Sequence, residues 1–262
     1  MLRLLKALPL TLAIAAVSIV ATSCGSNNGT KARFVNAIQN TNQYGGGLNV
    51  EVNGTQQFTN VTFPGVSAST YTSIPSGNVT FEGFEYPGVT TPVFTDSTTL
   101  SGGTQYTEVA TGQAGGTGGQ VVLLSLSDDN SLPNNGTLNF RVINAAYFSS
   151  PSAGVDIWIE HAPYPYALQQ PATIRGLVYP TPSGYVNVPY NPAPGEGFTV
   201  FVNRAEPGTG VGTPILNYTY QNINASSSSA AVCTLVLTDP ADGNGITMYF
   251  PPVVLDDNNC AN

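Results

Sequence analysis

The stretch Leu48–Asn53 reads Leu-Asn-Val-Glu-Val-Asn, alternating apolar and polar residues, and ends at the turn sequence Asn53-Gly54. A period of two places successive side chains on opposite faces of a half-buried β-strand. The stretch Val155–Glu160 repeats the pattern as Val-Asp-Ile-Trp-Ile-Glu. Gly and Pro interrupt almost every window of helical length, so these stretches predict strands of an all-β protein.

Other runs rich in β-branched and aromatic residues lie between turn residues, as is typical of a sandwich or barrel. These further predicted strands are Thr104–Ala110, Gln120–Leu126, Phe198–Val202 and Val232–Leu237.

The chain also repeats itself, which predicts two units of similar structure. The matched pairs are Arg33–Ala37 with Arg141–Ala145, Gly47–Val52 with Gly154–Ile159, Tyr71–Pro75 with Tyr185–Pro189, and Val122–Asp128 with Thr234–Asp239. We therefore expect two tandem immunoglobulin-like, Greek-key β-sandwich domains of about seven strands each. The first would span residues 32–130 and the second residues 137–262, joined by a linker at 131–136.

The repeated motifs resemble a bacterial family, the domain of unknown function DUF4397. They are an opening strand with Arg-x-x-Asn-Ala, a Gly-x-Asp/Asn strand, a Tyr-x-x-hydrophobic-Pro turn and a closing Leu-x-Leu-Thr/Ser-Asp. The resemblance covers Ala32 to about Thr247 and implies two tandem copies in an exported protein, often a lipoprotein. The His-Ala-Ser-Pro of many members is replaced here by Asn36–Gln39 and Asn144–Tyr147. The family supplies no established activity.

The N-terminus has the pattern of an export signal. Arg3 and Lys6 precede the uncharged apolar run Ala7–Ala21, which is shorter than the roughly 20 residues that a transmembrane helix needs. Small residues then lead to Cys24, which resembles a bacterial lipobox, although Ala21 stands where Leu is usual.

The lipobox resemblance implies that residues 1–23 are a signal peptide and that Cys24 carries the lipid. Residues 24–31 would form a polar tether. Gly25 after the Cys favours the outer membrane of the cell envelope. Several acyl chains would give stable anchoring. The alternative is a simple cleaved signal with an incidental Cys.

Low charge excludes several classes of protein. Only 8% of residues are charged, against roughly 25% in ordinary soluble domains. Without the signal, five basic and 15 acidic residues remain, too few cations to track nucleic-acid phosphates. The only histidine, His161, lies without a nucleophile motif near it, so we expect no enzyme activity and no cofactor.

Three small groups of residues remain as candidate sites. Cys233 and Cys260 can pair in an exported protein, although two free thiols are the alternative. Asp239, Asp242 and Asn244 resemble an oxygen-rich calcium loop, although an ordinary turn explains them as well. Trp158, Tyr164 and Tyr166 could stack on a sugar if their rings are exposed, or could simply cover the sandwich.

Two functions remain open at this point. The first is a non-enzymatic, membrane-anchored structural or protein-interaction module, which would bind an unknown protein or associate with itself. The second is a carbohydrate- or small-ligand-binding module that uses the aromatic residues of the second domain.

Overall fold

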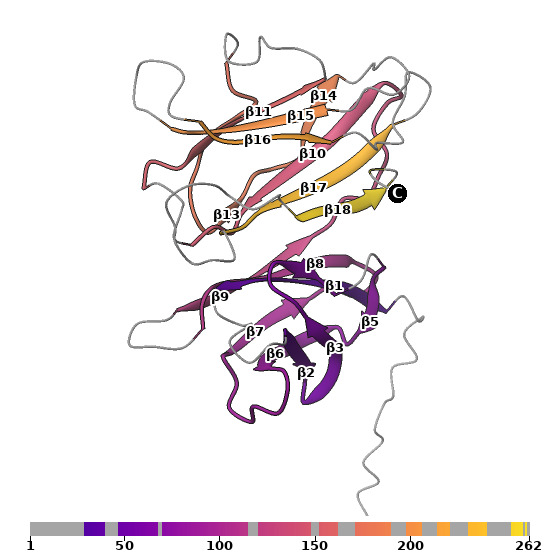
Figure 1. Cartoon of the computed structure of the whole chain (residues 1–262). Coiled ribbons are helices and arrows are strands. Elements are labelled where there is room, and N and C mark those ends of the chain that lie inside the picture. The colour runs from indigo at the N-terminus through magenta and orange to yellow at the C-terminus, as the bar shows by residue number, and fades with distance from the viewer. Residues whose placement is uncertain are drawn as a thin grey trace, which may run out of the picture.

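The computed structural model describes residues 29–39, 47–67, 70–114, 120–147, 152–161, 171–189, 198–205, 214–220, 230–239, 253–258 and 260. These residues form strands, turns and bends, which confirms the all-β fold predicted from the sequence. None of them belongs to a helix long and apolar enough to cross a bilayer. The strands form two stacked units (Figure 1), called here unit one and unit two.

Unit one contains two facing sheets. The first has the order β4-β1-β8-β9, with β5 also paired to β1, and the second has the order β3-β2-β6-β7. The strands are β1 (Thr30–Gln39), β2 (Leu48–Val52), β3 (Thr55–Val61), β4 (Gly65–Val66), β5 (Thr72–Ile74), β6 (Gly77–Glu85), β7 (Phe94–Leu100), β8 (Gln105–Gln113) and β9 (Val121–Ser127).

Unit two repeats this topology strand for strand. Its sheets have the orders β13-β10-β17-β18, with β14 also paired to β10, and β12-β11-β15-β16. The strands are β10 (Thr137–Asn144), β11 (Val155–His161), β12 (Ile174–Leu177), β13 (Thr181–Pro182), β14 (Val186–Pro189), β15 (Phe198–Arg204), β16 (Pro214–Tyr220), β17 (Ala231–Leu237) and β18 (Val253–Asn258).

Each unit has nine described strands where about seven were expected, because short strands occupy segments that read as turns. Tyr71–Pro75 and Tyr185–Pro189 contain β5 and β14, which pair with β1 and β10. The hairpin expected at Asn53-Gly54 is present, and both residues have positive φ, 51° and 72°. A two-residue hairpin turn requires this conformation, which Asn and Gly adopt readily.

One part of the sequence repeat was matched wrongly. Val122–Asp128 was matched with Thr234–Asp239, but the sheet orders make β9 equivalent to β18 and β8 equivalent to β17. Both β8 and β17 run parallel to the first strand of their unit, whereas β9 and β18 lie at the edge. The counterpart of Asp128 is therefore Asp257 rather than Asp239. Two adjacent strands with the same apolar composition cannot be distinguished by a short motif.

Three apolar clusters form the core. The clusters inside unit one and unit two contain the facing side chains of the two sheets in each sandwich. The third cluster lies between the units, where the sheet of β1, β8 and β9 packs on the sheet of β10, β17 and β18 (Figure 1). Its buried members are Val35, Ala37, Val109, Ile143, Ala145, Val236 and Leu255. Burial of both faces of these sheets joins the two sandwiches along a continuous interface.

Candidate functional site

The interface between the units contains a buried cluster of four charged side chains. Arg33 lies on β1 and Arg141 at the equivalent position of β10, while Asp128 follows β9 and Asp257 lies on β18. The arginine side chains are 1% and 4% exposed, and the side chains of both aspartates are fully buried. We call these four residues the salt-bridge cluster.

The two shortest ion pairs of the salt-bridge cluster cross from one unit to the other. Arg33 of unit one donates through Nη2 to Asp257 of unit two. Arg141 of unit two donates through Nη2 to Asp128 of unit one, at 2.5 Å. Arg33 also lies 3.8 Å from Asp128, so the four charges are close enough to act together. Each unit thus supplies one arginine and one aspartate to the other.

A second layer of polar and aromatic side chains fixes each arginine. Nε of Arg33 donates to Thr107 and Nε of Arg141 donates to Thr234, which are equivalent residues of β8 and β17. Tyr71 lies 4.9 Å from the guanidinium carbon of Arg33, and Tyr185 lies 4.7 Å from that of Arg141.

The two tyrosines also reach the carboxylates. The Tyr71 hydroxyl donates to Asp128 at 2.7 Å, and the Tyr185 hydroxyl donates to Asp257 at 3.2 Å. The contacts of unit one are therefore repeated in unit two, group by group. A buried network in which every charged group has a partner adds little net stability. Its main effect is to determine which faces of the two units pack against each other.

Electrostatics keeps Arg33 charged. Burial opposes the charge of Arg33, but the carboxylates of Asp257 and Asp128 hold the pKa of its guanidinium above the ordinary value. Burial raises the pKa of the Asp257 carboxyl, and Arg33 partly opposes this increase. Burial likewise raises the pKa of the Tyr71 and Tyr185 phenols, so both hydroxyls remain protonated donors at neutral pH.

The Asn of the Arg-x-x-Asn-Ala motif has a separate role inside each sandwich. Asn36 donates through Nδ2 to the carbonyl oxygen of Val61, and Asn144 donates in the same way to Leu177. Both bonds join the first strand of a unit to the opposite sheet and are 2.9 Å long. The motif therefore encodes an arginine for the interface and an asparagine that ties the two sheets together.

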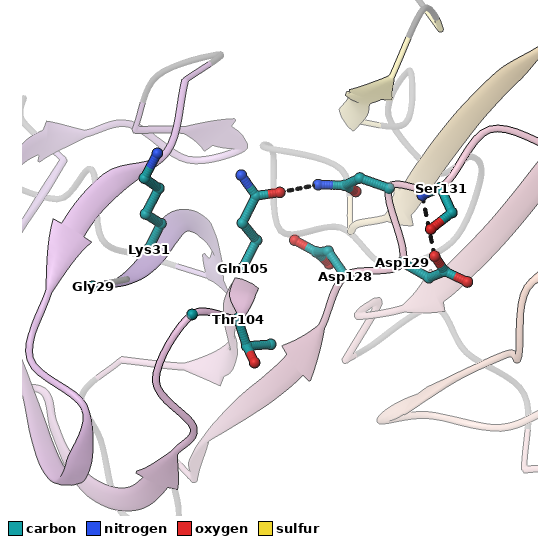
Figure 2. A pocket seen from close by; sticks show the side chains of 9 residues that line it. Gly29, Lys31, Thr104, Gln105, Asp128, Asp129 and Ser131 are labelled. Carbon is teal, nitrogen blue, oxygen red and sulfur yellow. Dashed lines mark hydrogen bonds between the residues drawn. The ribbon is translucent and has the colours of Figure 1, made fainter. Parts of the chain in front are cut away.

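A polar pocket of about 580 Å³ opens beside the salt-bridge cluster. Figure 2 shows Lys31 and Gln105 toward one side and Asp129 and Ser131 toward the other. Asn130 donates to Gln105 across the pocket, and the Ser131 amide donates to Asp129. These four polar groups of the pocket lining are thus already hydrogen-bonded to each other.

The structure joins Cys233 and Cys260 in a disulfide, with 27 residues of sequence separation. Cys24 lies outside the described residues, as do Tyr164 and Tyr166. Of the expected calcium loop, Asp239 is fully buried, while Asp242 and Asn244 lie outside the described residues. Within the described part of the chain, no three His, Cys, Asp or Glu side chains lie close enough to hold a metal ion.

Trp158 is buried, so of its two alternatives the exposed ring for stacking on a sugar is not the one that the structure has. Its strand neighbours Val155, Ile157 and Ile159 face the core of unit two, so Trp158 points to the opposite face, as alternation predicts. That face is covered at this position, because Trp158 is only 4% exposed. Alternation gives the direction of a side chain but not whether other parts of the chain cover it.

Unit one contains a buried carboxyl that was not predicted from the sequence. Glu108 on β8 is fully buried, accepts a hydrogen bond from Ser125 at 2.5 Å and leaves its second oxygen without a partner. Burial raises the pKa of Glu108 to about 8. Alternation along the strand could have predicted its burial. Glu108 lies on the same face of β8 as Tyr106 and Ala110, which pack into the unit-one core.

The salt-bridge cluster also escaped prediction, although a signal existed. Arg33 and Arg141 are two of only five basic residues after the signal, and they occupy the same place in each repeat.

Comparison with known proteins gives a family for the first part of the chain. No curated protein matches the sequence. Residues 30–150 match the model of the domain of unknown function DUF4397. The match covers all nine strands of unit one and continues through β10, the first strand of unit two. The chain therefore carries a DUF4397 domain.

Proposed function

We propose that this protein is a non-enzymatic module of the cell envelope, in which two sandwiches form one rigid body held at a membrane by a lipid on Cys24. The salt-bridge cluster is the observation that carries the proposal. Its four charged side chains are buried and bonded across the interface, so they stiffen the pair of units and are closed to a substrate.

The short distance between Cys24 and the first strand supports a place close to the bilayer. β1 begins at Thr30, six residues after Cys24. An extended chain spans at most about 3.5 Å per residue, so roughly 20 Å would separate the lipid from unit one. The side chain of Thr30 is buried and donates to the carbonyl oxygen of Ser101, which fixes the start of β1. A short tether on a fixed strand suits a module held near the membrane, where it would bind a protein partner or another copy of itself.

The alternative function, sugar binding through the aromatic residues of unit two, loses its central residue. Trp158 is buried, and a buried ring offers no face for stacking. We therefore propose the structural or interaction module alone.

Labelling with a palmitate analogue in a bacterial host tests the anchor. The wild-type chain should be labelled and should sediment with membranes, and Cys24→Ala should lose both properties. Cys233→Ala serves as the matched cysteine control and should keep the label. Equal labelling of the Cys24→Ala chain would overturn the anchor.

Spin-label distances test the rigid body. Labels at Thr95→Cys on β7 and Arg175→Cys on β12 report on the two units, because both native residues are exposed. In a Cys24→Ala background we expect one narrow distance distribution. A distribution as broad as that of two domains on a free linker would contradict the rigid pairing.

A further inference from the structure

β9 (Val121–Ser127) is an edge of the first sheet of unit one, because among the described strands it pairs only with β8. Its sequence, Val-Val-Leu-Leu-Ser-Leu-Ser, contains no charged residue, no Pro and no Gly, and its ladder with β8 has no bulge. Val121 and Leu123 pack against the core of unit one, while Leu124 and Leu126 pack against the interface between the units. All four side chains remain partly exposed. A long, regular, apolar edge is a template for pairing with another strand.

The hydrogen bonds of β9 leave alternate backbone groups directed away from β8. The amide of Asp128 donates to the carbonyl oxygen of Gln105, so these two residues form a hydrogen-bonded pair of the antiparallel ladder. Such pairs recur at every second residue. The amides and carbonyl groups of Val121, Leu123 and Ser125 therefore point outward, and no hydrogen bond joins them to another described residue. A strand laid beside β9 would bond to these groups.

The other described edge strands are protected against such pairing. β18, the equivalent of β9 in unit two, carries Asp256 and Asp257 and is bulged against β17. β7 carries Asp96, β3 is irregular against β2, and β16 begins with Pro214. The edge strands β4, β12 and β13 have only two to four residues. Charge, bulges, Pro and short length all hinder the addition of a strand, and β9 is the described edge strand that has none of them.

We propose that β9 pairs in antiparallel orientation with β9 of a second copy of this chain. A two-fold axis at Leu124 places the two copies of this residue opposite each other. In this register Val122 stands opposite Leu126 and Leu123 stands opposite Ser125, so outward backbone groups meet outward backbone groups. The first sheets of the two copies then form one continuous sheet.

Charge favours a second copy as the partner. The chain has a formal net charge of −8, so two copies repel each other wherever acidic surfaces meet. β9 against β9 places no like charges opposite each other, and the half-buried leucines of both copies gain apolar contacts. A basic strand from another protein would find no carboxylate in β9. This inference rests on the proposed interaction module and names its partner, but it does not depend on the lipid anchor.

Oxidative crosslinking of the full chain in its Cys24→Ala form tests the register. Leu124→Cys should give a disulfide-linked dimer, because directly opposed residues of a non-hydrogen-bonded pair have Cα atoms about 4.5 Å apart, which suits a disulfide. Leu123→Cys should crosslink about fivefold less or weaker still, since its opposite residue is Ser125. Thr98→Cys on β7 is the matched control, because Thr98 is partly exposed like Leu124, and it should remain monomeric.

Amide hydrogen exchange provides a second measurement on the Cys24→Ala chain without any change in β9. At low concentration the amides of Val122 and Leu124 should be protected by the ladder with β8, while those of Val121, Leu123 and Ser125 should exchange rapidly. When the chain is concentrated until it dimerises, exchange of these three outward amides should slow by about tenfold. This alternating response is specific to pairing at the edge, and it stands even if a cysteine variant fails to fold.

Four results would overturn the proposal. They are a monomer in sedimentation at every concentration up to about 1 mM, slowed exchange on a strand other than β9, crosslinking of Thr98→Cys as efficient as that of Leu124→Cys, and protection of the β9 edge only when another protein is added. The palmitate label and the spin-label distances are measured separately, so failure of the pairing is distinguishable from failure of the proposed function.

Discussion

Units one and two share a topology but differ in what the outer face of the second sheet carries. The register places Glu51 and Glu82 of unit one at the positions that Trp158 and Phe201 occupy in unit two. The carboxylate pair is partly exposed, whereas Trp158 is almost fully buried. The same backbone therefore supports a charged, open face in one unit and an aromatic, covered face in the other.

The first sheet of each unit shows the opposite trend. The salt-bridge cluster and its threonine and tyrosine neighbours are the same in both units, because each unit needs the other to satisfy its buried charges. Residues that act across the interface are thus repeated, while residues on the outer face of the second sheet have diverged. The predictions that follow test this division.

The largest effect is expected from the salt-bridge cluster. Asp128→Ala leaves Arg141 buried without its ion-pair partner, which should lower the free energy of unfolding by roughly 3–5 kcal/mol. Asp257→Ala should cost about as much, since it leaves Arg33 in the same state. Urea denaturation measures both values. Exposed Asp129→Ala is the control and should cost less than about 0.5 kcal/mol. A small effect of Asp257→Ala beside a large effect of Asp128→Ala would show that the two units do not contribute equally.

The disulfide should stabilise unit two alone. Cys233 is equivalent to Tyr106 of unit one, where no covalent link is possible. Closing 27 residues should be worth about 3–4 kcal/mol, so Cys260→Ala should lose that amount. Hydrogen exchange should accelerate in β17 more than in β8. Reductant should have no further effect on the Cys260→Ala chain, and equal acceleration in both strands would contradict a local role.

Glu108 marks a smaller difference between the cores, because its counterpart in unit two is Leu235. The folded-state pKa of Glu108 is about 8, against 4.5 as the ordinary value. The folded protein therefore holds a proton that the unfolded chain releases, and stability falls as the pH rises from 4.5 to 8, by roughly 1.4 kcal/mol per pH unit.

Glu108→Leu should remove this contribution, so the variant should be more stable than the wild type at pH 8 and this difference should shrink toward pH 5. Urea denaturation at pH 5 and pH 8 measures the change. Glu82→Gln is the control and should keep the wild-type slope. A Glu108→Leu chain with an unchanged slope would show that Glu108 is ionised in the folded state.

The smallest effect concerns the outer faces and changes spectra rather than stability. Trp158 is the only tryptophan, so its fluorescence should resist quenching by iodide. A Trp158→Phe, Glu51→Trp chain moves the ring to the equivalent position of unit one. Because Glu51 is partly exposed, this ring should be quenched several times more strongly. Similar quenching in the two proteins would contradict the difference in exposure between the outer faces of the two units.

Much of the fold could be predicted from local patterns. Alternation located β2 and β11, and the repeat of Arg33–Ala37 located the first strand of each unit. The short strands β5 and β14 were missed because strands of only three and four residues carry too little periodicity. Asp257 was missed as the partner of Arg33 because 224 residues separate them and nothing local records which edge strands meet.

The sequence by itself determined the all-β class, the two-unit repeat and the low charge, because these depend on composition and on periodicity along the chain. Only the tertiary structure decided that Arg33 pairs with Asp257, that Trp158 is covered and that Glu51 faces Glu82. Each of these depends on which surfaces meet or which strands stand in register. Alternation along a strand determines which face a side chain lies on. Its bonding partner and its burial depend on residues that are far away in the chain.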